Sequence, residues 1–208
     1  MSFSSRERER LADLLRDKGP DAPTLCGGWT TRDLAAHLWL RENRPDAAAG
    51  MFVSLLSGHL ESVMEDAKAR DYDALVDAWA SGPGKLNPWR YLDSQANFAE
   101  HFVHHEDVRR GEGKARPRDF SRAVNDKFCE TLSVAGKLFL RKSTKPVILQ
   151  PEGRKPIVTA DKRGVAERGD DVVRVSGEPG ELLLWAFGRD AVDVTIEGDE
   201  GAVHRSAL

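Results

Sequence analysis

Cysteine is scarce in this sequence, which holds only Cys26 and Cys129 among its 208 residues. The two lie far apart and form no C-x-x-C pair, which excludes a disulfide framework and a cysteine-rich zinc site. No segment reaches the roughly 18 apolar residues that a membrane span needs. Residues 1–10 also lack the apolar core of a signal peptide. We therefore expect a reduced, cytoplasmic protein without a membrane partner.

A large block of basic residues is also missing, and the net charge is only −3. Both signs are mixed along the chain, which argues against a nucleic-acid partner. The glycines of residues 82–85 do not have the spacing of a phosphate-binding loop. With 40% hydrophobic and 31% charged residues, the composition is that of a globular protein long enough to bury a core.

The hydrophobic pattern predicts helices in the first two thirds of the chain. They are expected after a cap at Ser4 or Ser5, from a capping box at Thr30 to Asp33, and over residues 46–69, 71–81, 92–110 and 119–141. A weak point is expected near Gly58, and residues 82–88 read as a loop. Because the connections are short, four or five of these helices are predicted to form an antiparallel bundle over residues 1–142.

From Ser143 onward the pattern changes to short β-branched segments. Strands are predicted at residues 146–150, 155–160, 171–177 and 192–199, with one helix at about 179–187. These elements form a small α/β unit over residues 143–208, near the lower size limit for an independent domain. The predicted fold class is therefore α+β, a helical bundle followed by this unit.

Residues 97–110, NFAEHFVHHEDVRR, concentrate acids and histidines on one predicted helix. Side chains three and four residues apart share a helix face, so Glu100 and His104 can bind the same ion. His101 and His105 have the same spacing. Spacing alone leaves both pairs open, beside the alternative of a solvated, charged helix end.

A third ligand is offered by His37, which shares a predicted helix face with Leu34 and Leu38. A lone histidine on an apolar face is usually a satisfied core residue. If its helix lies beside residues 97–110, however, His37 can meet Glu100 and His104 inside the bundle. Two imidazoles and a carboxylate suit zinc, iron, nickel or manganese. Three ligands leave a coordination position open for water or substrate.

Two further residues of the acid-rich helix lie one turn from the possible ligands on the same stripe. Asn97 and Asp107 are therefore expected to act as hydrogen-bond partners that orient the metal ligands. Asp107 is also a possible fourth ligand, which would close the site and make the metal structural.

Residues 24–38 (TLCGGWTTRDLAAHL) and 97–110 together resemble the mycothiol-dependent maleylpyruvate isomerase N-terminal family, within the DinB-like four-helix metalloproteins. More narrowly, they resemble an actinobacterial subgroup of uncharacterised metal-binding proteins. Residues 177–190, with VTIEGD after them, resemble that family's small C-terminal domain. The resemblance implies a DinB-like bundle in which His37, Glu100 and His104 hold the metal, with His101 and His105 as neighbours of the site.

The resemblance also implies chemistry on a thiol. A metal with an open position can bind a low-molecular-weight thiolate and keep it nucleophilic at neutral pH. In the isomerase, mycothiol adds to the cis double bond of maleylpyruvate, and rotation and elimination follow. Other DinB-like relatives transfer thiols to electrophiles. We accordingly expect an isomerase or S-transferase with a divalent metal, zinc first and Ni²⁺, Fe²⁺ or Mn²⁺ as alternatives, and mycothiol as cosubstrate.

Three more residues are possible contributors to catalysis. Arg109 and Arg110 could bind a substrate carboxylate, although arginines at a helix C-terminus also simply favour the helix dipole. Cys26 precedes the helix of His37 and could approach the metal or the thiol, or be a small buried apolar residue. The other function class that stays open is a non-catalytic metal-binding or ligand-sensing protein, and a monomer and a homodimer are both compatible with the sequence.

Overall fold

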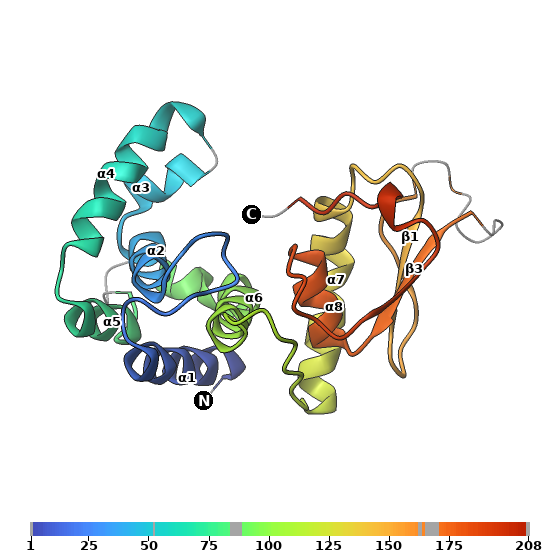
Figure 1. The fold of residues 1–208 in the computed structure, drawn as a ribbon, viewed down its shortest axis with the longest axis horizontal. Coiled ribbons are helices and arrows are strands. Elements are labelled where there is room, and N and C mark those ends of the chain that lie inside the picture. The colour runs from blue at the N-terminus through green and yellow to red at the C-terminus, as the bar shows by residue number, and fades with distance from the viewer. Residues whose placement is uncertain (1, 52, 84–88, 162–163, 165–170, 207–208) are drawn as a thin grey trace. The chain divides into compact units, whose positions relative to one another are not determined.

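The computed structural model describes residues 2–51, 53–83, 89–161, 164 and 171–206 (Figure 1). Contacts between residues divide the chain into two compact units, residues 1–112 and residues 113–208, called unit 1 and unit 2 below. Both units contain helices, and the sheet lies in unit 2. None of the helices in the described ranges combines the length and apolar composition needed to cross a bilayer.

The regular elements described in unit 1 are helices and 3₁₀ turns. They are α1 (Phe3–Lys18), α2 (Thr31–Asn43), α3 (Pro45–Ala48), the 3₁₀ turns η1 (Ala49–Met51) and η2 (Ser54–Leu56), α4 (Ser57–Lys68), α5 (Tyr72–Ala80) and α6 (Trp89–Arg109). The loop before α2 carries an isolated bridge between Pro23 and Thr30. Helix α1 begins earlier than predicted, because Ser2 rather than Ser4 or Ser5 caps it by accepting a hydrogen bond from the Ser5 amide. Residues 84–88 of the predicted loop lie outside the described residues.

The predicted helical stretch 46–69 is divided into α3, two 3₁₀ turns and α4. The interruption falls between Ala49 and Leu56, before Gly58 rather than at it. Gly58 lies in the first turn of α4. Glycine is tolerated better near a helix terminus than in its interior, where it costs about 1 kcal/mol relative to alanine.

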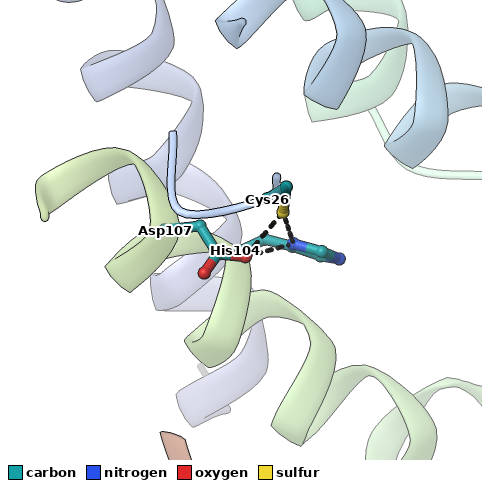
Figure 2. Close-up of side chains that lie close together, drawn as sticks. All are labelled: Cys26, His104 and Asp107. Atoms are coloured by element: carbon teal, nitrogen blue, oxygen red, sulfur yellow. Dashed lines mark hydrogen bonds and ion pairs between the residues drawn. The ribbon is translucent and has the colours of Figure 1, made fainter. Parts of the chain in front are cut away.

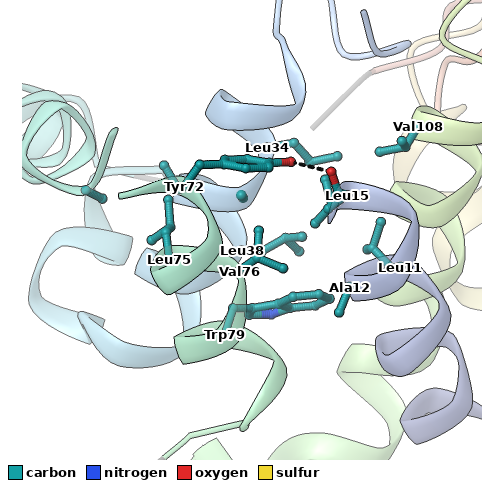
Figure 3. Close-up of a cluster of buried hydrophobic side chains, with 13 residues drawn as sticks. Leu11, Ala12, Leu15, Leu34, Leu38, Tyr72, Leu75, Val76, Trp79 and Val108 are labelled. Carbon is teal, nitrogen blue, oxygen red and sulfur yellow. Dashed lines mark hydrogen bonds between the residues drawn. The ribbon is translucent and has the colours of Figure 1, made fainter. Parts of the chain in front are cut away.

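The core of unit 1 is formed by apolar faces of α1, α2 and α5 (Figure 3). Leu11, Leu34 and Trp79 are completely buried in this cluster. Each large apolar side chain contributes roughly 1.5–3 kcal/mol when it is fully buried. The Tyr72 hydroxyl donates a hydrogen bond of 2.9 Å to the Leu15 carbonyl, which satisfies the polar end of a buried ring.

The start of α2 is held by the predicted capping box. Thr30 accepts from the Asp33 amide, and the Asp33 carboxylate accepts from the Thr30 amide at 2.9 Å. Lys68 of α4 pairs with Asp33 at 2.8 Å, which ties the two helices together. This anchored turn sets the rotation of α2, and therefore the direction in which His37 points.

Unit 2 combines two helices with a four-stranded sheet. Its elements are α7 (Arg122–Phe139), β1 (Val147–Pro151), β2 (Ile157–Val158), β3 (Val173–Gly177), α8 (Pro179–Ala186), β4 (Thr195–Glu197) and the 3₁₀ turn η3 (Glu200–Ala202). The strand order is β2-β1-β3-β4, with β1 and β3 parallel and both edge strands antiparallel to their neighbours. Helix α8 packs on β1 and β3, and α7 packs on α8 and β2.

The division into units differs from the predicted boundary at residues 142 and 143. Helix α7 groups with unit 2, where Phe128, Leu132 and Phe139 are buried. Phe139 contacts Phe187 with ring centroids 4.7 Å apart. The sequence pattern changes after α7, where helices give way to strands. The boundary between the two units lies before α7, because α7 contacts unit 2. The predicted α+β class, with a helical part followed by a small sheet, is confirmed.

Candidate metal centre

The C-terminal half of α6 is polar and yet buried. His101 and Asp107 are at most 1% exposed, and His104 is 8% exposed. These side chains are therefore not the solvated end of a helix. Burying charged groups is costly unless each is paired, so their partners define what this helix does.

One candidate metal-binding group joins two helices. His37 of α2 and Glu100 and His104 of α6 each direct one ligand atom to a common point, and the three atoms lie within 4.8 Å of one another. Glu100 Oε1 is 3.4 Å from His37 Nε2 and 3.2 Å from His104 Nε2. The three residues predicted as ligands are thus brought together.

These separations suit a metal ion. With bond lengths of about 2.0–2.2 Å and a tetrahedral angle, a nitrogen and an oxygen ligand of zinc lie about 3.4 Å apart. Both observed distances from Glu100 Oε1 are close to this value. Two imidazoles and a carboxylate are borderline ligands that match a divalent transition metal, so the residues present fit such an ion.

Asp107 orients the imidazole of His104. Its Oδ2 accepts a hydrogen bond of 2.9 Å from His104 Nδ1, on the ring edge opposite Glu100. A proton held on Nδ1 leaves the lone pair on Nε2, which is the atom that faces Glu100 and His37. The role expected for Asp107 as an orienting partner therefore has a matching geometry.

Cys26 contacts the same carboxylate from a loop that passes over α6 (Figure 2). Its Sγ donates to Asp107 Oδ2 at 3.0 Å and lies 3.9 Å from His104 Nδ1. Cys26, His104 and Asp107 form the second candidate metal-binding group among the described residues. The loop is fixed by hydrogen bonds from Leu25 N to the Asp107 carbonyl and from Trp29 N to the Cys26 carbonyl.

Two residues that the sequence did not single out as parts of the site also surround the first group. Arg41 Nε lies 3.3 Å from Glu100 Oε1, and its Nη1 donates to Asn97 Oδ1 at 2.6 Å. The Trp29 ring contacts the His37 ring with centroids 5.2 Å apart. Asn97 therefore orients Arg41 rather than a histidine. The available signal for Arg41 was its position one turn after His37 on the same face of α2.

The electrostatics of the group distinguish its two histidines. Burial lowers the pKa of His37, so this imidazole is neutral and ready to bind a metal. Burial alone would lower the pKa of His104 as well, but the charge of Glu100 and the hydrogen bond to Asp107 raise it well above its usual value. Burial likewise opposes ionisation of Glu100, but His104 holds the pKa of this carboxyl well below its usual range. A metal ion would replace the proton on His104 Nε2, which faces Glu100, while the proton on Nδ1 stays hydrogen-bonded to Asp107.

His101 and His105 have other partners, on α1 and, for His101, also on α2. His105 Nδ1 is 2.8 Å from Glu7 Oε2. His101 Nδ1 is 2.9 Å from Ser4 Oγ, and its Nε2 is 3.5 Å from Glu42 Oε1. Neither histidine belongs to a candidate metal-binding group among the described residues. They help to pack α1 on α6.

Arg109 and Arg110 both pair with Glu106 of the preceding turn. Arg109 Nη1 is 2.7 Å and Arg110 Nε 2.6 Å from Glu106 Oε2. Arg110 is 1% exposed, and Arg109 is partly exposed. A role for either in binding a substrate carboxylate stays a prediction.

The chain thus combines a helical unit, which carries a His/Glu/His group on two of its helices, with a small sheet in unit 2. Residues 4–49 match the family model described as the mycothiol maleylpyruvate isomerase N-terminal domain, which confirms the predicted resemblance over that segment. No curated protein matches the chain.

Two solved structures share the fold over almost the full length of the chain. The crystal structure of the mycothiol-dependent maleylpyruvate isomerase is 18% identical, with a TM-score of 0.60, and the match covers 98% of this chain and 94% of that one. A histidine-to-alanine mutant of the isomerase is 17% identical, with the same TM-score and coverage. At this identity the likeness establishes the fold.

Proposed function

We propose that this protein is a mycothiol-dependent enzyme, an isomerase or S-transferase, that holds a divalent metal with His37, Glu100 and His104. The observation that carries the proposal is the convergence of these three ligand atoms within 4.8 Å. The family match over residues 4–49 supports the thiol cosubstrate, and it includes His37. The proposed metal is zinc, with nickel, iron and manganese as alternatives.

The chain's own residues prepare the site in three ways. Asp107 keeps the His104 proton on Nδ1, so that Nε2 faces the ion. Arg41 Nε pairs with Glu100 Oε1 at 3.3 Å, the same oxygen that faces the two imidazoles. The Trp29 ring contacts the His37 ring, with the centroids 5.2 Å apart, and helps to position that imidazole. A bound metal with an open position would supply Lewis acidity, which stabilises a thiolate at neutral pH.

Metal analysis of the full-length protein, purified without chelator, tests the site. We expect about one divalent ion per chain, and its loss in His104→Ala. His204→Ala is the matched control, because His204 is exposed in unit 2 and belongs to neither candidate group. No bound metal, even after incubation with zinc, would overturn the proposed site.

The reaction is tested separately on the metal-loaded protein. We expect binding of mycothiol and turnover of maleylpyruvate or another electrophile in its presence, and loss of both in Glu100→Gln. Metal and mycothiol binding without turnover of any electrophile would instead support the ligand-binding alternative. Metal binding without any affinity for a thiol would overturn the enzymatic proposal while leaving the metal site intact.

A further inference from the structure

His104 presents a separate set of ligands to each of its two ring nitrogens. On the Nε2 side lie Glu100 and His37, and on the Nδ1 side lie Asp107 and Cys26. The proposed function takes its metal ligands only from the first set, and Asp107 serves there as a hydrogen-bond partner. The second set contains a thiol, an imidazole and a carboxylate, which is a different donor chemistry on the same buried residue.

The second set is built from two separate segments that the fold holds together. Cys26 lies in the loop before α2, and Asp107 is completely buried on α6. The close approach of the loop depends on Gly111, where a Cβ would collide with the Pro23 carbonyl. The loop backbone also binds the Asp107 carbonyl through the Leu25 amide at 3.1 Å. The thiol is therefore held over the His104 ring by the backbone.

We propose that Cys26, His104 and Asp107 form a second metal site, which prefers a thiophilic ion such as Cd²⁺ and which excludes an ion from the first site. Sulfur ligands favour such ions over Mn²⁺ and Mg²⁺, for which carboxylate and water are better ligands. The inference does not rest on the proposed enzymatic activity, because neither His37 nor Glu100 takes part in the second site.

The exclusion follows from the two tautomers of a neutral imidazole. An ion at the first site needs the lone pair on Nε2 and the proton on Nδ1, where Asp107 accepts it. An ion at the second site needs the lone pair on Nδ1, so the proton moves to Nε2, where Glu100 accepts it at 3.2 Å. The Cys26 thiol loses its proton to solvent as the sulfur binds the metal.

The second site needs a small rearrangement. Ligands of a tetrahedral zinc ion lie about 3.4–3.6 Å apart, the larger value applying to sulfur. Asp107 Oδ2 is now 3.0 Å from Cys26 Sγ and 2.9 Å from His104 Nδ1, which are hydrogen-bond distances. The ion would replace the two bridging protons and move Asp107 Oδ2 about half an ångström away from the other two ligand atoms. Cys26 Sγ and His104 Nδ1, now 3.9 Å apart, would come slightly closer together. A side-chain movement of this size leaves the helices in place.

The test is a titration of the reduced, metal-free, full-length protein with Cd²⁺, followed by the near-ultraviolet absorption that arises only from a cadmium–thiolate bond. We expect the band to reach its maximum at about one ion per chain. It should be lost in Cys26→Ser and in His104→Ala. Cys129→Ser is the matched control and should keep the band, because Cys129 is on α7 of unit 2.

His37→Ala separates this proposal from the proposed function. It removes a ligand of the first site but none of the second, so the cadmium band should persist while Mn²⁺ binding is lost. A band that is absent from the wild-type protein, or that disappears in Cys129→Ser and stays in Cys26→Ser, would overturn the second site without affecting the first. In wild-type protein already loaded with Mn²⁺, we expect Cd²⁺ to release the Mn²⁺. Simultaneous retention of both ions would overturn the exclusion.

Discussion

Asp107 Oδ2 lies 2.9 Å from His104 Nδ1. Of the two carboxylates in the candidate metal-binding groups, Asp107 lies on the Nδ1 edge of the ring and Glu100 on the Nε2 edge. The contact joins residues three apart on α6, so the helix itself sets its geometry. It decides which nitrogen of His104 faces His37 and Glu100. The binding of a metal by His104 therefore depends on the carboxylate of Asp107.

Replacing Asp107 by asparagine should weaken metal binding without removing a ligand of the first site. The neutral amide accepts the hydrogen bond from His104 Nδ1 less strongly, so that His104 Nε2 becomes a weaker ligand for the metal. We expect the affinity for Mn²⁺ to fall by about 10- to 100-fold in Asp107→Asn. Competition with a chromophoric chelator would measure it. Asp77→Asn, at an exposed ion pair on α5, should bind as the wild-type protein does, and equal affinity in both variants would contradict the orienting role.

The buried ion pair of Arg8 and Glu42 should make unit 1 sensitive to acid. Burial by itself would raise the pKa of Glu42, but hydrogen bonds from His101 and Arg8 lower it below its usual value. A lowered pKa stabilises the fold above the unfolded-state pKa, and this stabilisation is lost as the pH falls toward the folded-state pKa. The free energy of unfolding, measured in urea, should therefore decrease below about pH 4.3.

Glu42→Gln is the variant that isolates this pair. It leaves the Arg8 guanidinium buried without its charge partner and should lower the free energy of unfolding at pH 7 by about 3 kcal/mol. In Glu42→Gln, the free energy of unfolding should fall less between neutral and acid pH than in the wild-type protein, since the titrating carboxyl is gone. An unchanged pH profile would show that other carboxyls are responsible.

The capping box should contribute to the stability of α2. Thr30→Ala removes the side chain that accepts from the Asp33 amide and should cost about 1 kcal/mol of unfolding free energy. Ser133→Ala, in the interior of α7, removes a hydroxyl of similar size but no cap and serves as the control. A loss of equal size in both variants would rule out capping as the cause.

Position 111 should not tolerate even the methyl side chain of alanine. Its Cβ would collide with the Pro23 backbone, which cannot move away as a flexible side chain can. We expect Gly111→Ala to lower the unfolding free energy by about 1–3 kcal/mol. Gly58→Ala is the matched control, because a Cβ there meets nothing within 4 Å and alanine favours the helix. Gly111→Ala should also displace Cys26 and weaken the cadmium–thiolate absorption.

Local sequence patterns predicted most of the secondary structure. Side chains recurring every three to four residues indicated α5 and α6, and the Thr30 to Asp33 spacing identified the start of α2. These features depend on residues a few positions apart, so neighbouring side chains specify them. The cap at Ser2 was missed because Ser2, Ser4 and Ser5 all have the chemistry of a cap, and only the backbone conformation selects one.

The amino-acid sequence by itself determined the ligand chemistry: histidines and acids at helical spacing on α6, and a histidine on the inner face of α2. It could not decide between His104 and His105, because both have a histidine or an acid four residues before them. The tertiary structure places His104 beside His37 and Glu100, because α2 packs against that face of α6, whereas His105 contacts Glu7 of α1. Helical spacing is a local property, whereas the partner of each buried side chain depends on which distant segment packs against it.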